Sequence, residues 1–379
     1  MKYDKSNPYL ASIKERYILN KPGSKKCTQH LVLQVADPEL RYAIGDSVAI
    51  FPRHDDSLVA KTLEALGATG NEIVRFRQEN DHITLRFALQ EKLNITHPTR
   101  KILTLIADRL DAGAVKEQLQ LLLNEENKEA LKQFLKEAEL WKLLSQFPVS
   151  FSPQELCDLL PPLLPRFYSI ASSPIVDQGE IHLTVALVRY EQNQAVRHGV
   201  CSHFLCNLAK IDHPEIPIYI QPTHSFTLPS DLSTPIIMVG PGTGIAPFRA
   251  FMREREARGA TGKNWLFFGD WNRDLDFLYQ NYWETLMQKG VLKLHTAFSR
   301  DHQQKVYVQH LMLENASELF SWLEQGAYFY VCGDADRMAR DVEAALLQII
   351  SQETGCDEKG ARDYLKKMRH EKRYLRDVY

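Results

Sequence analysis

The sequence predicts two domains: an antiparallel β-barrel interrupted by a helical insertion, and then an α/β domain with a parallel sheet. Three observations lead to this prediction. Short alternating apolar runs fill residues 28–52, helical periodicity replaces them from about 57 to 162, and strand patterns then return. Beyond residue 230, apolar strands alternate with glycine turns and helices, as in parallel sheets with crossovers. We therefore expect domains at 1–230 and 231–379, with the insertion at about 57–162.

The first domain is expected to be a barrel because its strand candidates are short and separated by turn residues. The run at 28–52 is broken by Asp-Pro-Glu and Gly-Asp. After the insertion, strand patterns return in "RFYSIASS", "IHLTVALVRY" and "IPIYIQP". Since strands on both sides of the insertion belong to one domain, a closed antiparallel barrel is the expected form.

The insertion is expected to be helical because its apolar residues recur at helical spacing. Leu131, Leu135 and Ala138 follow one another at intervals of four and three residues. The segment "SPQELCDLL" opens with Ser152 and Glu155 in the positions of a capping box, which marks the start of a helix.

Composition and charge exclude several classes of protein. Among 379 residues, 46 Lys and Arg stand against 48 Asp and Glu, which gives a net charge of −2 and no overall field for nucleic acid. No leader and no membrane-spanning run is evident. Six scattered cysteines form no C-x-x-C pair. The segment "RHDD" at 53–56 could bind a metal, but we expect it to be a solvated turn. We expect a cytoplasmic protein without a metal site, a nucleic-acid partner or a membrane.

A glycine-rich turn follows the first strand of the second domain. "IIMVGPGTGIAPF" runs from an apolar strand through Gly240, Gly242 and Gly244 into a helix with Pro247 in its first turn. Such glycines let the backbone approach a pyrophosphate at a helix N-terminus. The spacing differs from the usual G-x-G-x-x-G, so an ordinary tight turn remains an alternative.

A cluster of cations and hydroxyls follows a later strand of the same domain. Cationic and hydroxyl donors of this kind suit the extra 2′-phosphate of NADP, although a solvated strand end would look similar. The residues in "AFSRDHQQKVYVQ" are Ser299, Arg300, Lys305, Tyr307 and Gln309.

Two segments of the first domain combine groups suited to a phosphate and a flat ring. In "LPRFYSIASSP", strand alternation puts Arg166 and Tyr168 on one face, and Ser169 begins the other. In "HGVCSHFL", Gly199 and Ser202 lie at a predicted helix start, where backbone amides can bind phosphate. Tyr168 considered alone is more typical of a core position.

In their order along the chain, these segments resemble the FAD- and NADPH-binding half of the diflavin reductases, a family similar to ferredoxin–NADP reductases. "FFGD…DFLY", "VCGDADRMARDV" and the terminal "RDVY" extend the resemblance over essentially the whole chain. It is strongest to the flavoprotein component of NADPH sulfite reductase. We expect that no flavodoxin-like FMN domain precedes residue 1, and Ile44 stands where the family usually has proline.

The resemblance implies a set of residues for FAD. Arg166, Tyr168 and Ser169 would meet the pyrophosphate, the face of the flavin ring and its reactive edge. The other implied positions are Phe167, the backbone of Thr184, Val185 and Ala186, Tyr190, and the phosphate loop Gly199, Val200, Cys201 and Ser202.

The resemblance also implies a nicotinamide site and a catalytic set. Catalysis would use Ser169, Cys332 and Asp377 to orient the two rings and balance charge during hydride transfer. The terminal Tyr379 would stack on the flavin where nicotinamide must sit. The NADPH residues would be Gly242, Thr243, Ser299, Arg300, Lys305, Tyr307, Gln309 and Asp341.

The resemblance implies an NADPH-dependent FAD oxidoreductase that passes electrons to a redox protein. The acceptor would be an FMN or flavodoxin domain, a ferredoxin or the sulfite reductase haemoprotein. A stand-alone NADPH:flavodoxin or ferredoxin reductase is the alternative, and a non-catalytic assembly subunit is a remote one.

Overall fold

The computed structural model divides the chain into two compact units. The first contains Met1–Ala49, Phe167–Leu187 and Ala209–Tyr379, and the second contains Ile50–Arg166 and Val188–Leu208. Residues 188–208 thus group with the helical insertion, and the predicted boundary near 230 stays a prediction. Residues 77–81 and 148 of the predicted insertion lie outside the described part of the chain. The structure describes residues 2–76, 82–147, 149–192 and 195–379.

A six-stranded sheet is formed by strands between residues 9 and 221, and its antiparallel pairs confirm the predicted antiparallel β fold. Its order is β6-β3-β10-β1-β2-β7, and β1–β10, β1–β2 and β2–β7 pair antiparallel. The N-terminal β1 was not predicted. The strands are β1 (Tyr9–Ile18), β2 (Thr28–Gln34), β3 (Ser47–Ile50), β6 (Arg166–Ser169), β7 (Glu180–Ala186) and β10 (Ile216–Gln221).

A five-stranded parallel sheet follows and confirms the second class. Its order is β13-β12-β11-β14-β15, and every neighbouring pair is parallel. The last strand consists of the chain end, which sequence patterns did not assign to a strand. The strands are β11 (Ile236–Val239), β12 (Asn264–Asp270), β13 (Lys293–Phe298), β14 (Tyr328–Gly333) and β15 (Tyr374–Val378).

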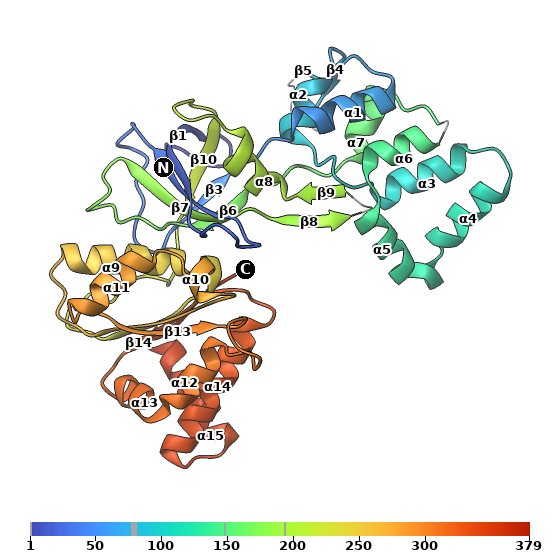
Figure 1. Cartoon of the computed structure of the whole chain (residues 1–379). Coiled ribbons are helices and arrows are strands. Elements are labelled where there is room, and N and C mark those ends of the chain that lie inside the picture. Colours follow the sequence, from blue (N-terminus) through green and yellow to red (C-terminus); the bar gives the residue numbers. More distant parts are fainter. Residues whose placement is uncertain (1, 77–81, 148, 193–194) are drawn as a thin grey trace. The chain divides into compact units, whose positions relative to one another are not determined.

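Helices cover both faces of the parallel sheet (Figure 1). Ile236 and Met238 of β11 pack in the core on the α9 and α11 face, whereas Ile237 and Val239 pack towards α12–α15. Strand alternation therefore produces two cores from one strand. The helices are α9 (Ala246–Ala257), α10 (Arg273–Asp276), α11 (Gln280–Gln288), α12 (Val308–Glu314), α13 (Ala316–Glu324), α14 (Met338–Thr354) and α15 (Glu358–His370).

The second unit is the predicted helical insertion with two small hairpins. Ser152 caps α7, accepting a hydrogen bond from the Glu155 amide as the capping-box pattern predicts. The predicted strand "IHLTVALVRY" divides between β7 and the hairpin strand β8. The elements are α1 (Asp56–Leu66), β4 (Ile73–Arg75), β5 (His82–Thr84), α2 (Leu85–Phe87), α3 (Arg100–Arg109), α4 (Ala114–Leu123), α5 (Lys128–Glu137), α6 (Leu140–Gln146), α7 (Pro153–Leu159), β8 (Arg189–Gln192), β9 (Ala195–His198) and α8 (Val200–His203).

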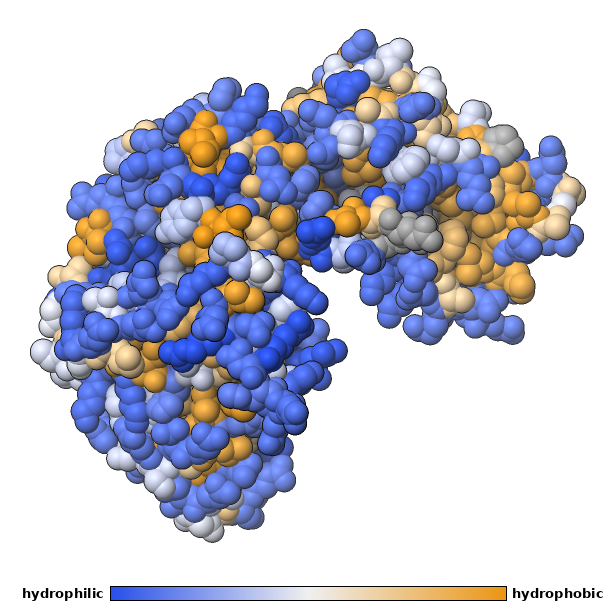
Figure 2. All heavy atoms as spheres, in the orientation of Figure 1, coloured by the Kyte–Doolittle hydropathy of each residue, from blue (hydrophilic) through white to orange (hydrophobic). Residues whose placement is uncertain are grey.

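Hydrophobic side chains also reach the surface of this unit. Figure 2 shows them gathered over α3, α4 and α5, and α4 leaves Val115 and Leu121 more than half exposed. Among the described residues, no helix combines the length and apolar character needed to cross a bilayer.

Candidate active site

The end of the chain brings the three predicted catalytic residues together. Strand β15 pairs with β14 so that Asp377 lies opposite Cys332. The Ser169 hydroxyl at the end of β6 donates a 2.5 Å hydrogen bond to Asp377 Oδ2, and Cys332 Sγ lies 3.7 Å from the same oxygen. Ser169 and Cys332, which are 208 and 45 positions from Asp377 in the sequence, thus meet at its carboxylate.

Burial determines the chemistry of the thiol in this group. Cys332 is completely buried, and desolvation together with the negative charge of Asp377 raises the pKa of its thiol well above the ordinary value. The thiol therefore stays protonated at neutral pH and can donate a hydrogen bond, but it is not a thiolate nucleophile. The arrangement suits orientation of a reacting group and not covalent catalysis.

The terminal tyrosine lies beside the glycine turn. The Tyr379 amide donates to Gly333 O at 3.1 Å, and its carbonyl accepts from the Ala335 amide at 3.1 Å, so the chain end is fixed on both sides. Its hydroxyl lies 2.9 Å from Thr243 Oγ1. Tyr379 as a whole residue is 64% exposed.

The glycine turn has the form expected for a phosphate-binding backbone. Gly242 adopts φ +56°, which favours glycine. A Cβ on Gly244 would lie 2.1 Å from Cys332 O, so the turn packs directly against the strand that carries the thiol. Helix α9 begins at Ala246 with Pro247 in its first turn, as predicted.

Residues after β13 form an exposed polar edge, which we call the β13 cation cluster: Arg300 and Lys305. Both side chains are exposed, whereas Ser299 is 9% exposed and its amide donates to Asp270 O. Tyr307 lies at the start of α12. Gln309 Nε2 donates to Asp341 Oδ2 at 3.3 Å, so two predicted NADPH positions meet across α12 and α14.

The predicted FAD residues of the first unit differ in what they can offer. Phe167 is 53% exposed and meets Tyr219 edge to face. Thr184 and Val185 are buried, and the Thr184 hydroxyl lies 2.7 Å from the Tyr279 hydroxyl. Their side chains are therefore committed to the protein, and only the backbone of β7, the last strand of the sheet order, remains for a ligand.

The predicted phosphate-loop residues of the second unit include a side chain that is engaged within the protein. The Ser202 hydroxyl accepts from the Val188 amide and donates to Gly199 O, both at 3.1 Å. That hydroxyl is consequently occupied within the protein. Gly199 caps α8, and a Cβ there would lie 2.9 Å from the Val188 Cβ.

A pocket of about 280 Å³ in the second unit is lined by two of the predicted FAD residues, Tyr190 and Val200. The cations Arg53, Lys61 and Arg197 line it together with the carboxylates Asp55 and Glu139, and Arg197 pairs with Glu139. Arg166, at the start of β6, is exposed and contacts carbonyl oxygens of the preceding residues.

The predicted solvated turn at 53–56 is wrong for His54. Its side chain is 2% exposed, and Nε2 lies 3.0 Å from Leu93 O. Burial lowers the pKa of His54 to about 4, because the charged imidazole would lose its hydration.

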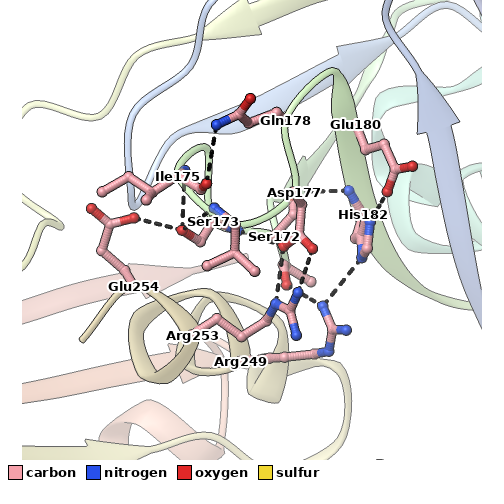
Figure 3. A network of polar contacts seen from close by, with 12 residues as sticks. Ser172, Ser173, Ile175, Asp177, Gln178, Glu180, His182, Arg249, Arg253 and Glu254 are labelled. Atoms are coloured by element: carbon pink, nitrogen blue, oxygen red, sulfur yellow. Dashed lines mark hydrogen bonds and ion pairs between the residues drawn. The ribbon is translucent and has the colours of Figure 1, made fainter. Parts of the chain in front are cut away.

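A buried network joins the segment after β6, together with β7, to helix α9 (Figure 3). Arg253 donates to both carboxylate oxygens of Asp177, and the Ser173 hydroxyl donates to Glu254 at 2.6 Å. The α9 network comprises Ala171, Ser173, Asp177, Glu180, His182, Arg249, Arg253 and Glu254.

The same network explains a group of possible metal ligands. Asp177, Glu180 and His182 offer ligand atoms within 4.8 Å of one another. However, Asp177 pairs with Arg253, and Glu180 pairs with Lys14 and His182. Each carboxylate already faces a cation, so the group is accounted for by ion pairs.

Sequence reasoning missed Tyr279, Trp271 and the α9 network. Tyr279 has φ +56°, unusual for a non-glycine residue, and its hydroxyl lies 2.9 Å from His30 Nδ1 as well as near Thr184. Trp271 comes directly after β12, at the carboxyl edge where parallel sheets bind ligands, and that position was the available signal.

Comparisons with known proteins match both parts of the chain to families. Residues 1–204 match the family described as "FAD binding domain", and residues 238–344 match "Oxidoreductase NAD-binding domain". The chain is similar to proteins named "Sulfite reductase [NADPH] flavoprotein alpha-component". The identity is 42% over 379 residues in Bacillus subtilis, 40% over 378 in Vibrio cholerae and 41% over 378 in Yersinia enterocolitica.

All three alignments cover 100% of this chain, which spans 60–62% of the length of these relatives. The two family matches confirm the prediction of a flavoprotein oxidoreductase with FAD and a nicotinamide nucleotide as cofactors. The FAD family match alone extends over more than half of the chain. The chain therefore belongs to the FAD-binding domain family and continues into an oxidoreductase NAD-binding domain.

Proposed function

We propose that this chain takes hydride from NADPH onto FAD and passes the electrons to a redox protein, as the flavoprotein of NADPH sulfite reductase does. The observation that carries the proposal is the meeting of Ser169, Cys332 and Asp377 beside the glycine turn. Bound FAD would supply a two-electron acceptor that can also release single electrons.

The residues present fit FAD. Tyr190 and Val200 line a cation-bearing pocket suited to the adenosine end of the cofactor, and the backbone at Gly199 suits phosphate. Tyr168 and Ser169 follow Arg166 on β6, so this short strand could bind a phosphate group through Arg166 and a flat ring through Tyr168. The other flavin positions are Phe167, Cys201, Ser202, and the β7 backbone at Thr184, Val185 and Ala186.

The nicotinamide nucleotide is assigned to the parallel sheet. Gly242, Thr243 and the start of α9 would receive the pyrophosphate, and Arg300 with Lys305 would receive the 2′-phosphate of NADPH. Ser299, Tyr307, Gln309 and Asp341 complete this assignment.

Asp377 has the central role in the catalytic set. Its carboxylate accepts from Ser169 and lies near the Cys332 thiol, so it fixes both donors and places a negative charge where nicotinamide becomes positive. Tyr379, held by the Gly333 and Thr243 contacts, would stack on the flavin ring and move aside for nicotinamide.

Asp377→Asn tests this assignment because it removes the charge and keeps the shape. In anaerobic stopped flow, NADPH should bleach bound FAD at least tenfold more slowly in the variant, with FAD content unchanged. Cys332→Ala should slow the same step less. Unchanged rates in both variants would refute the catalytic assignment.

The acceptor is proposed to be an FMN or flavodoxin domain that relays electrons to the sulfite reductase haemoprotein. The support is the similarity to sulfite reductase flavoproteins along the whole chain. A panel of flavodoxin, ferredoxin and sulfite reductase haemoprotein, each offered with NADPH, tests it. Rapid reduction of ferredoxin alone would favour an independent ferredoxin reductase.

We also propose a cytoplasmic location. Among the described residues, no cysteine forms a disulfide, and this includes the partly exposed Cys27 and Cys356, which suits a reducing compartment. Fractionation of the source cells would test the location directly.

A further inference from the structure

The ring of Trp271 lies against Arg300, one of the two cations of the β13 cation cluster. The guanidinium carbon of Arg300 is 3.2 Å from the centroid of the Trp271 ring, and Lys26 Nζ is 4.7 Å from the same centroid. Cations over an indole face are attracted by its electron density, and tryptophan is the strongest such partner. The ring thus supports the guanidinium group of Arg300 on its face.

Backbone hydrogen bonds hold Trp271 itself in place. The Trp271 amide donates to Asp270 Oδ1 at 2.7 Å, and its carbonyl accepts from the Arg300 amide at 2.8 Å. Asp270 is 8% exposed and pairs with Lys26. Tryptophan and arginine are therefore fixed to each other through backbone as well as through their side chains.

The stacked guanidinium keeps its donors available. All guanidinium N–H groups lie in the plane of the group, so stacking on a ring leaves them pointing outwards. Arg300 is exposed, and within the described part of the chain no carboxylate lies within ion-pair distance of it. An oriented, unneutralised cation with free donors suits a phosphate monoester.

We propose that Trp271 is a positioning residue that holds Arg300 for the 2′-phosphate and so sets the preference for NADPH over NADH. This inference rests on the proposed function. It adds a residue that does not touch the hydride-transfer atoms and acts through Arg300. Exposed Arg300 without the ring would sample many rotamers, and ordering it on binding would reduce affinity.

Calorimetric titration with adenosine 2′,5′-bisphosphate and with AMP tests the role without turnover. Trp271→Leu should weaken binding of the bisphosphate roughly fivefold and leave AMP binding unchanged, in line with the strength of a cation–π contact. Trp271→Phe, which keeps a ring, should recover most of the loss. Adding Trp271→Leu to Arg300→Ala should cause no further loss.

The outcomes distinguish an error in the 2′-phosphate assignment from an error in the role of Trp271. If the unaltered protein does not distinguish the bisphosphate from AMP, the 2′-phosphate assignment itself is wrong. If it does distinguish them, but Trp271→Leu weakens both ligands equally or neither, the positioning role is wrong. Should the leucine variant fail to fold, Trp271→Phe decides. If the ratio of bisphosphate affinity to AMP affinity in Trp271→Phe then equals that in Arg300→Ala, an aromatic ring at position 271 does not position Arg300 and the proposal is wrong.

Discussion

The α9 network and the β13 cation cluster belong to the same compact unit but treat their arginines differently. Arg253 is largely buried and grips both oxygens of Asp177, whereas Arg300 is exposed and lies on an indole ring. Arg249 likewise donates within the protein, to Ala171 O at 2.7 Å. One set of cations is used inside the protein, and the other remains available for a ligand.

This difference indicates two roles for the arginines: those of the α9 network align parts of the protein, and Arg300 is available to bind a ligand. Buried ion pairs lose hydration and are weak sources of net stability, but removing one partner leaves a buried charge at high cost. The α9 network therefore fixes the strand that carries Ser169 relative to the helix that follows the glycine turn. An exposed cation costs little to keep unpaired, so the β13 cation cluster can be reserved for a phosphate.

Breaking the Asp177–Arg253 pair should have the largest effect. Arg253→Met should lower the free energy of unfolding by about 3 kcal/mol, because Asp177 is left buried without its partner. Chemical denaturation measures this change. The double variant with Asp177→Asn should recover part of the loss, and a purely additive result would contradict the pairing.

Removing the β13 cation cluster should leave the fold intact. Arg300→Ala with Lys305→Ala should raise the KM for NADPH about a hundredfold, near 2.7 kcal/mol, because two charge-assisted contacts are lost. Stability should change by less than about 0.5 kcal/mol, since both side chains are exposed. Steady-state kinetics with NADH provide the control, and an equal rise in both KM values would refute the assignment.

Acidification should destabilise the fold through the buried imidazole of His54. Its folded pKa of about 4 lies below the ordinary 6.5, so the unfolded chain binds the proton first. The associated stability is complete above pH 6.5 and declines as pH falls towards 4. Between pH 7 and 5 the expected loss is about 2 kcal/mol.

Denaturant unfolding at several pH values measures this dependence. His54→Gln keeps a donor near Leu93 O but does not titrate, so its stability should vary less between pH 7 and 5. A variant with the same pH dependence as the unaltered protein would exclude His54 as the cause.

Deleting Tyr379 should have the smallest effect. The Thr243 hydroxyl would be released and the proposed ring stack lost, so NADP⁺ should bind about fivefold more tightly, near 1 kcal/mol. Discrimination against NADH should weaken in parallel. Calorimetric titration with both nucleotides checks this, and unchanged affinities would exclude a gating role for the chain end.

The sequence predicted most of the regular elements, although not β1 and β15, and it predicted the glycine turn after β11. Strand, glycine and helix follow one another within a dozen residues at Gly240–Gly244, so periodicity and turn chemistry suffice there. The catalytic set followed only from family resemblance, because Ser169 and Asp377 are 208 residues apart and belong to strands of two different sheets.

Other features depend on tertiary packing that no local pattern encodes. The α9 network needs the segment after β6 to face one side of α9, and Trp271 needs Arg300 from the next strand. The burial of His54 is also non-local, since its partner Leu93 lies 39 residues away. Polar residues in such contacts look like ordinary surface charges in the sequence.

The most direct test is anaerobic mixing of the FAD-loaded chain with NADPH and, separately, with NADH. Hydride transfer needs both the aligned Ser169–Asp377 site and the cation cluster, so we predict rapid loss of flavin absorbance with NADPH and much slower loss with NADH at equal concentration. No loss with NADPH would contradict the proposed reaction. Equal rates with the two nucleotides over the whole concentration range would contradict the 2′-phosphate site.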